Sequence, residues 1–192
     1  MKEFSPDLRE IDEFFSREGI SYAIIGGVAV QRWGEPRFTE DIDITVMVAA
    51  EEEPKLIAKL VTTFEPRISD AAEFALRHRV CLVRTSNGCS VDISFGVAGF
   101  EEELIKRTSD FEIGDDCRVP VCSAEDLVIL KAVAGRPRDW EDIEGVLYRQ
   151  HSGLDLVYLR SWLNEFSLLL EQPALSEQFE ALWKEIVGQD TM

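Results

Sequence analysis

The chain has 192 residues, of which 45% are hydrophobic and 30% charged, and its formal net charge at pH 7 is −17. This length and composition predict one ordinary globular domain with room for a small helical appendage. The acidity argues against a long nucleic acid as partner, because phosphate contacts call for a basic face. It favours a cationic small molecule or a basic protein instead, although acidic surfaces also simply keep proteins soluble.

The sequence shows no pattern typical of a targeting segment or a zinc site. No apolar run approaches the roughly 20 residues of a membrane-spanning helix. The first six residues lack the basic and apolar regions of a secretory leader, so a cytoplasmic location without membrane contact is expected. The cysteines and histidines are spread along the chain without C-x-x-C spacing: Cys81, Cys89, Cys117, Cys122, His78 and His151. Reduced, buried thiols are therefore expected rather than a zinc centre.

Apolar periodicity and turn residues predict alternating helices and strands over the first 122 residues. Ser5 is expected to cap a helix over 6–18 that stops at Gly19. A buried strand over 22–25 then ends in Gly26-Gly27. The further expected elements are a helix over 28–33, a strand over 41–48, helices over 51–64 and 70–78, strands over 80–85 and 90–95 around Asn87-Gly88, a helix over 101–107, and strands over 111–113 and 118–121.

The remaining residues are expected to be wholly helical. Ser123 opens a capping-box pattern, and Gly135-Arg136-Pro137 ends the helix that it starts. Three more helices are expected over 139–150, 155–170 and 176–187. The predicted fold class is α+β, with a mixed sheet flanked by helices and a C-terminal helical cap. The expected domains are an α/β core over residues 1–122 and a helical region over 123–192.

Three strand aspartates are the candidate catalytic residues. Asp41 and Asp43 alternate with apolar residues, so both carboxylates project from one face, roughly 6–7 Å apart along the strand. Asp92 alternates with apolar residues in the same way on a later strand. Like charges on neighbouring strands repel each other, and a divalent cation relieves the repulsion. The alternative is that each aspartate merely occupies the exposed face of a half-buried strand.

Gly26 and Gly27 stand between a strand and a helix, 13 residues before Asp41. Glycines at such a junction let the backbone approach a phosphate, toward which helix N–H groups point. The alternative is a plain turn.

The ordered combination of these motifs resembles the nucleotidyltransferase (polymerase β-like) superfamily. The segments that carry the resemblance are Ile25-Gly26-Gly27, Asp41-Ile42-Asp43-Ile44 and Val91-Asp92-Ile93. The run from Arg37 to Ile44, with Thr39 two residues before Asp41, is similar to the bacterial branch of AbiEii-type toxin nucleotidyltransferases. The segment from Lys131 to Asp139, followed by Asp142, resembles that branch too. The likeness covers residues 20–145.

The resemblance implies an enzyme that uses two Mg²⁺ ions and an NTP such as ATP. Asp41 and Asp43 would bind both ions, and Asp92 would complete one site and orient or deprotonate the acceptor hydroxyl. Gly26 and Gly27 would contact the phosphates through their backbone.

Three further residues are candidates for nucleotide binding, and each has a structural alternative. Arg37 and Thr39 would contact phosphate or acceptor, or else Arg37 neutralises the aspartates and Thr39 caps the strand. Lys131 would reach the triphosphate, or else it is a solvated helix lysine. Arg136 and Asp139 are expected to pair with each other or cap a helix.

The expected function is therefore transfer of a nucleoside monophosphate from an NTP to a hydroxyl of a small molecule, a protein or a tRNA end. The acidic balance favours the first two acceptors. The alternative is a non-catalytic member of a toxin–antitoxin pair that binds a nucleotide or a partner protein.

Overall fold

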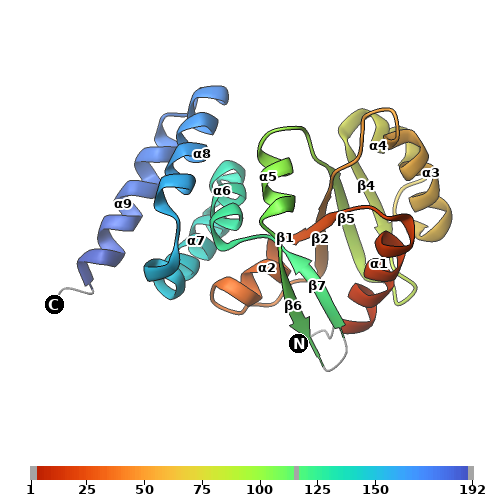
Figure 1. Cartoon of the computed structure of the whole chain (residues 1–192), viewed down its shortest axis with the longest axis horizontal. Coiled ribbons are helices and arrows are strands. Elements are labelled where there is room, and N and C mark those ends of the chain that lie inside the picture. Colours follow the sequence, from red (N-terminus) through yellow and green to blue (C-terminus); the bar gives the residue numbers. More distant parts are fainter. Residues whose placement is uncertain (1–3, 115–116, 190–192) are drawn as a thin grey trace. The chain divides into compact units, whose positions relative to one another are not determined.

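The computed structural model describes residues 4–114 and 117–189 (Figure 1). Met1, Lys2 and Glu3, on which the leader-peptide expectation partly rests, lie outside the described residues. The chain forms two compact units. The first comprises Met1–Val28 and Phe38–Cys122, and the second comprises Ala29–Arg37 and Ser123–Met192. The segment 29–37, which the sequence analysis assigned to the α/β core, thus belongs to the unit that contains the C-terminal helices.

A mixed β-sheet forms the centre of the first unit, and its strand order is β3-β4-β5-β2-β1-β7-β6. Its strands are β1 (Tyr22–Ile25), β2 (Asp41–Val46), β3 (Glu65–Pro66), β4 (Val80–Arg84), β5 (Ser90–Phe95), β6 (Ser109–Ile113) and β7 (Cys117–Val121). β2 is parallel to β5 and β1 is parallel to β7, whereas the other neighbours are antiparallel. The predicted mixed sheet is confirmed, and the short strand β3 is an addition to it.

One face of this sheet is fully buried. Its side chains on β2, β4 and β5 are at most 1% exposed: Ile42, Ile44, Cys81, Val83, Val91 and Ile93. The helices of the first unit are α1 (Ser5–Glu18), α3 (Glu53–Thr63), α4 (Ala71–His78) and α5 (Phe100–Lys106), and α2 (Gly26–Trp33) starts in this unit and continues into the second. The Phe15 ring of α1 stacks on Tyr22 of β1 with 4.8 Å between centroids. Such burial of apolar side chains supplies most of the stability of a fold.

The predicted ends of two helices need correction. α1 begins at Ser5 itself, after Phe4, and the Ser5 hydroxyl donates to the Ile113 carbonyl instead of capping the helix. Its predicted stop at Gly19 is confirmed, because Gly19 adopts the left-handed conformation with φ +67°. α2 begins at Gly26 rather than at residue 28. The two glycines are therefore the first residues of the helix and not a turn before it.

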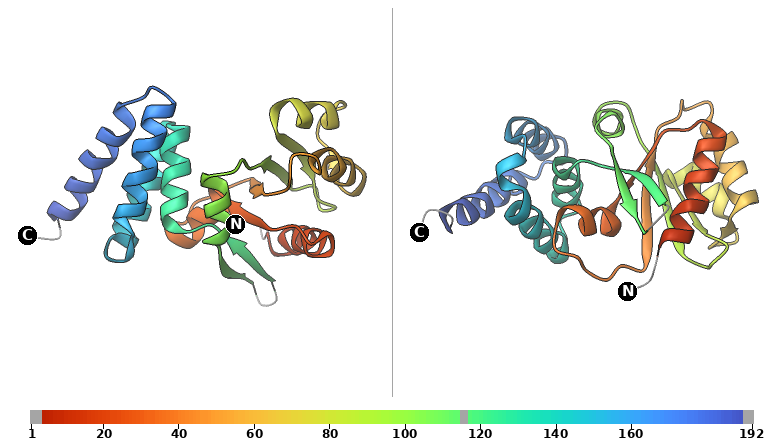
Figure 2. Two further views of the ribbon diagram at one scale, coloured as in Figure 1. Left: turned by 45° about the horizontal axis from the view of Figure 1, so that its top comes forward. Right: turned by 60° about the horizontal axis from the view of Figure 1, so that its bottom comes forward.

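The second unit is helical, as predicted for the C-terminal residues. It contains α6 (Ala124–Ala134), α7 (Pro137–Gln150), a 3₁₀ turn at His151–Gly153, α8 (Leu156–Leu169) and α9 (Ala174–Gln189). α8 packs between α6 and α9, and α7 contacts both α6 and α9 (Figure 2). Ser123 caps α6 by accepting from the Asp126 N–H at 3.1 Å, which confirms the predicted start.

Two further expectations concern the whole chain. All four cysteines are buried, as predicted, and none of them belongs to a disulfide in the described part of the chain. Within residues 4–114 and 117–189, none of the helices has the length and apolar character that crossing a membrane requires.

Candidate active site

The three candidate carboxylates lie on one face of two neighbouring strands. In the parallel β2–β5 pair, Asp43 stands directly beside Asp92 and Asp41 beside Ser90. Neighbouring strands are about 4.8 Å apart, so Asp43 and Asp92 are close enough to repel each other. Asp41, Asp43 and Asp92 are all half-buried, opposite the fully buried face. We call the face that carries these three aspartates the carboxylate face.

Gly26 brings the backbone of α2 against the Asp43 carboxylate. The residue has φ +60°, and a Cβ atom placed on it would lie 1.9 Å from Asp43 Oδ2. A side chain at this position would displace Asp43, which explains the glycine better than turn formation does. The N–H groups in the first turn of a helix have no acceptor within the helix, and here that turn starts beside a carboxylate.

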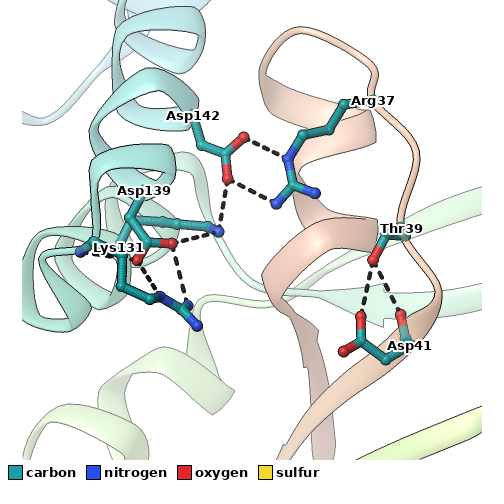
Figure 3. Close-up of polar contacts among 7 residues, drawn as sticks. Arg37, Thr39, Asp41, Lys131, Asp139 and Asp142 are labelled. Carbon is teal, nitrogen blue, oxygen red and sulfur yellow. Dashed lines mark hydrogen bonds and ion pairs between the residues drawn. The ribbon is translucent and has the colours of Figure 1, made fainter.

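Thr39 holds the carboxylate of Asp41 in place. Its hydroxyl lies 3.0 Å from Asp41 Oδ1 and donates to it, and its side chain is only 7% exposed (Figure 3). Gly27 makes room for this side chain, since a Cβ on Gly27 would lie 2.5 Å from Thr39 Oγ1. The same hydroxyl lies 3.4 Å from the Asp41 carbonyl oxygen, so Thr39 supports both the carboxylate and the backbone at the start of β2.

Asp92 has an arginine partner that no sequence motif indicates. Arg67 follows β3 in the chain, and its Nη1 donates to Asp92 Oδ1. The Arg67 N–H also donates to the Leu82 carbonyl at 3.0 Å, which extends the β3–β4 ladder by one residue. Nothing in the local sequence around Arg67 indicates this contact, because it depends on the order of three strands.

Lys131 lies in a buried ion network within the second unit. Its Nζ is 2.9 Å from Asp139 Oδ1 and 2.7 Å from Asp142 Oδ2, and its side chain is 8% exposed (Figure 3). Arg37 binds the same Asp142 through two parallel hydrogen bonds, 2.6 Å from Nε to Oδ1 and 2.8 Å from Nη2 to Oδ2. The alternative of a solvated helix lysine is therefore wrong.

The break between α6 and α7 builds this network. Gly135 ends α6 in the left-handed conformation, and α7 starts two residues later at Pro137. The last turn of one helix then stands next to the first turn of the other. Asp139 accepts from the Arg136 N–H at 3.2 Å and from Arg136 Nε at 2.6 Å, which confirms the expected Arg136–Asp139 pair.

The network keeps its carboxylates ionised. Burial raises the pKa of Asp142, but hydrogen bonds from Arg37 and Lys131 outweigh it, so the net pKa lies below the ordinary 3.8. The pKa of Asp139 is likewise lowered, because hydrogen bonds from Arg136 and Lys131 outweigh its burial.

A small cavity of about 210 Å³ in the first unit lies away from the carboxylates. It is lined by residues that follow β2, such as Val48 and Ala49, together with Glu18 and Lys59. Asp41 and Asp43 are at the opposite end of β2, so this cavity does not include them.

The sequence and the fold both match known proteins. The family model described as "Nucleotidyl transferase AbiEii toxin, Type IV TA system" matches residues 12–188. The chain belongs to the AbiEii nucleotidyltransferase family. This confirms the resemblance inferred from the Arg37–Ile44 run and the Gly26-Gly27 motif. No curated protein sequence matches the chain.

Two solved structures share the fold of this AbiEii family member. One is an antigenic nucleotidyltransferase-like protein from Paracoccidioides brasiliensis, with a TM-score of 0.53 and 18% identity over 93% of each chain. The other is the antibiotic-resistance factor ANT(2'')-Ia, with a TM-score of 0.51 and 16% identity over 95% of this chain and 96% of that one. At these identities the likeness establishes the nucleotidyltransferase-like fold.

The donor set on the carboxylate face fits a divalent cation in its chemistry. Asp41, Asp43 and Asp92 are oxygen ligands of the kind that Mg²⁺ prefers. Within the described ranges 4–114 and 117–189, no three acidic, histidine or cysteine side chains converge as a formed metal site. In this AbiEii family member Asp92 is instead engaged by Arg67.

Proposed function

We propose that this chain transfers a nucleoside monophosphate from an NTP to a hydroxyl group of an acceptor. The observation that carries the proposal is the alignment of Asp43 with Asp92 across the parallel β2–β5 pair, with Asp41 on the same face. Membership of the AbiEii nucleotidyltransferase family supports this class of reaction.

Two Mg²⁺ ions fit the proposed reaction. Asp41 and Asp43 would hold both ions, and Asp92 would complete one of the two sites. When bound, the ions supply charge stabilisation for the attacking and the leaving oxygen of the displacement.

The remaining chemistry belongs to the chain's own side chains and backbone. The acceptor oxygen forms a bond to the α-phosphorus, and the bond from that phosphorus to the pyrophosphate oxygen breaks. Asp92 orients the acceptor hydroxyl and accepts its proton. The N–H groups of Gly26 and Gly27 contact the phosphates. Thr39 keeps Asp41 in place through the 3.0 Å hydrogen bond.

Arg37 and Lys131 are proposed to contribute to nucleotide binding. Both are cations with side chains that are fixed by Asp142, and fixed cations bind anionic groups at a lower cost in conformational entropy. In this proposal Asp142 has a supporting role for both.

The acceptor is proposed to be a small cationic molecule or a protein rather than a long nucleic acid. The formal net charge of −17 supports this choice, because a phosphate backbone would be repelled by most of the surface. A cytoplasmic location, where NTP is abundant, fits the proposal.

The direct test is incubation with Mg²⁺ and an NTP labelled on the α-phosphate. Wild-type protein should transfer the label, and the double variant Asp41→Ala with Asp43→Ala should lose at least about 10³-fold in rate. The matched control is Asp110→Ala with Glu112→Ala, which removes two exposed carboxylates that are also two residues apart on a strand. Equal rates for the two double variants would contradict the assignment.

A second candidate function is a non-catalytic, partner-binding member of a toxin–antitoxin pair, which the toxin description of the family model favours. Thermal unfolding distinguishes the two. An enzyme should gain stability by about 2.7 kcal/mol with NTP and Mg²⁺ at 100 times the Kd. A melting temperature that millimolar NTP and Mg²⁺ leave unchanged, together with no transfer of label, would support the partner-binding function.

A further inference from the structure

We propose that Arg67 is a positioning residue for Asp92, which holds this carboxylate in the metal-free protein and competes with a divalent cation for its oxygens. The inference rests on the proposed function, because it takes Asp92 as a metal ligand. It adds a residue to the site that lies outside the three acidic motif positions.

The register of the sheet places the two side chains in one row. Arg67 pairs with Leu82 through its N–H, Leu82 stands opposite Asp92, and Asp92 stands beside Asp43. With about 4.8 Å between strands, the Arg67 and Asp92 backbones are about 10 Å apart. The long arginine side chain crosses over β4 on the carboxylate face and donates to Asp92 Oδ1.

The charge on this face explains why a cation is needed at Asp92. Asp43 and Asp92 are direct neighbours, and neighbouring like charges on a sheet destabilise it. Arg67 offsets one of these charges. The guanidinium thus supplies in the metal-free protein part of the compensation that a bound cation would supply.

The Arg67–Asp92 pair is exposed enough to be exchanged. The side chains are 27% and 36% exposed, in contrast to the buried network around Lys131. An ion pair of this exposure contributes about 0.2–1 kcal/mol, so a cation that displaces Arg67 loses at most about fivefold in affinity. Removing the guanidinium should therefore make metal binding up to about fivefold tighter.

The test measures Mn²⁺ binding by titration calorimetry or by electron paramagnetic resonance, without nucleotide and without turnover. Arg67→Gln should bind Mn²⁺ more tightly than the wild type, by more than about twofold and at most about fivefold. The matched control is Arg84→Gln, which removes the same charge from a half-buried arginine that stands opposite Ser90 on the same face. Arg84→Gln should leave the Mn²⁺ affinity within about twofold, because Arg84 stands opposite Ser90 and not opposite a carboxylate.

Three variants separate the possible results. If wild type binds Mn²⁺, Asp92→Asn weakens the binding, and Arg67→Gln leaves it unchanged or weaker, the competition is overturned while the proposed metal site stands. If Asp92→Asn has no effect on Mn²⁺ binding, Asp92 is not a metal ligand, so its proposed metal role and the competition by Arg67 are both overturned, while the transfer of label still tests the proposed reaction. If Arg67→Gln and Arg84→Gln tighten the binding equally, a general change of charge is the cause, and the specific role of Arg67 is overturned.

A readout in the wild-type protein avoids the effect of a substitution on folding. Side-chain NMR of the arginine N–H groups should show a change for Arg67 when Mg²⁺ is added, since its hydrogen bond to Asp92 is lost. The Arg84 resonances should stay unchanged. An unchanged Arg67 resonance at saturating Mg²⁺ would overturn the proposal.

Discussion

The carboxylates of the sheet and those of the helical unit balance their charge in different ways. Asp139 and Asp142 are 3% and 5% exposed, and Lys131 between them is 8% exposed. Asp92 is 36% exposed, and its arginine partner is 27% exposed. A buried charge can hardly change its partner, because losing it leaves an uncompensated ion in a low-dielectric environment. A half-exposed charge can exchange one partner for another, since water compensates during the exchange.

This difference distinguishes a buried ion network that keeps its partners from an aspartate whose partner can exchange. Lys131 and Arg37, which we propose to contribute to nucleotide binding, are both held by Asp142. The aspartates of the carboxylate face have the accessibility that a metal or a substrate requires. The two groups of carboxylates should therefore respond to substitution as differently as their burial indicates.

The largest effect is expected when the buried network loses its lysine. Lys131→Met should lower the free energy of unfolding by about 3 kcal/mol, because Asp139 and Asp142 lose a shared cation in a buried position. Urea unfolding measures this change. The control is Lys106→Met, which breaks only exposed pairs with Glu102 and Glu103 and should cost less than about 0.5 kcal/mol. An equal loss of unfolding free energy in the two variants would mean that burial of an ion pair does not determine how much its loss destabilises the protein.

A methyl group at Gly26 should damage the site more than the fold. Gly26→Ala is expected to lower the transfer rate about 100-fold, because the Cβ atom would overlap Asp43 and shift its carboxylate. The matched control is Gly19→Ala, which has φ +67° and open space around the new Cβ. Both variants should lose about 1 kcal/mol of stability from the left-handed backbone. A similar activity of the two would show that Asp43 does not depend on the backbone of α2.

The hydroxyl of Thr39 should have a smaller effect on catalysis. Thr39→Val keeps the shape of this buried side chain but removes the donor to Asp41, and a hydrogen bond to a charged group contributes about 1.5–3 kcal/mol. A rate lower by about tenfold or more is expected in the transfer assay. Thr62→Val, which removes an exposed hydroxyl bound to helix carbonyls, should keep full activity. Full activity of Thr39→Val would show that the Thr39 hydroxyl is not needed for the transfer reaction.

The smallest effect is the pH dependence of the buried network. The pKa of Asp142 is lowered in the folded protein, so its contribution to stability is present above the ordinary value of 3.8 and is lost as the pH falls through the folded-state pKa. The difference in unfolding free energy between wild type and Asp142→Asn should stay constant near neutral pH and shrink below about pH 4. A difference that grows on acidification would contradict the direction of the shift.

Local patterns were sufficient to predict most of the fold. The alternation of Asp41 to Val46 and the turn at Asn87-Gly88 are properties of short segments. Strand β2 contains this alternation, and strand β5 follows this turn, as the sequence predicts. Ser5 was predicted wrongly, because its hydroxyl binds Ile113 on a distant strand instead of the first turn of α1. The strand at Glu65–Pro66 is too short for a periodic pattern to be recognised.

The sequence was sufficient to predict which residues form the candidate site, but not which side chains contact one another in it. Asp43 and Asp92 come together because β2 and β5 are parallel neighbours, which alternation alone cannot show. The Arg67–Asp92 contact spans three strands, and the Arg37–Asp142 contact joins the segment after α2 to α7. Partners of this kind depend on tertiary structure, so a single sequence contains no local pattern for them.

The parallel pairing of β2 with β5 also sets the order in which the site can assemble. Antiparallel strands can meet through a hairpin, but a parallel partner requires a long crossover, which here consists of α3, β3, α4 and β4. Closing such a loop before any native contact is made is slow, because its entropy cost comes first. During synthesis, Asp43 leaves the ribosome well before Asp92 exists to stand beside it. A nascent chain that ends before β5 therefore lacks the aspartate pair, and the carboxylate face can form only after this crossover has folded.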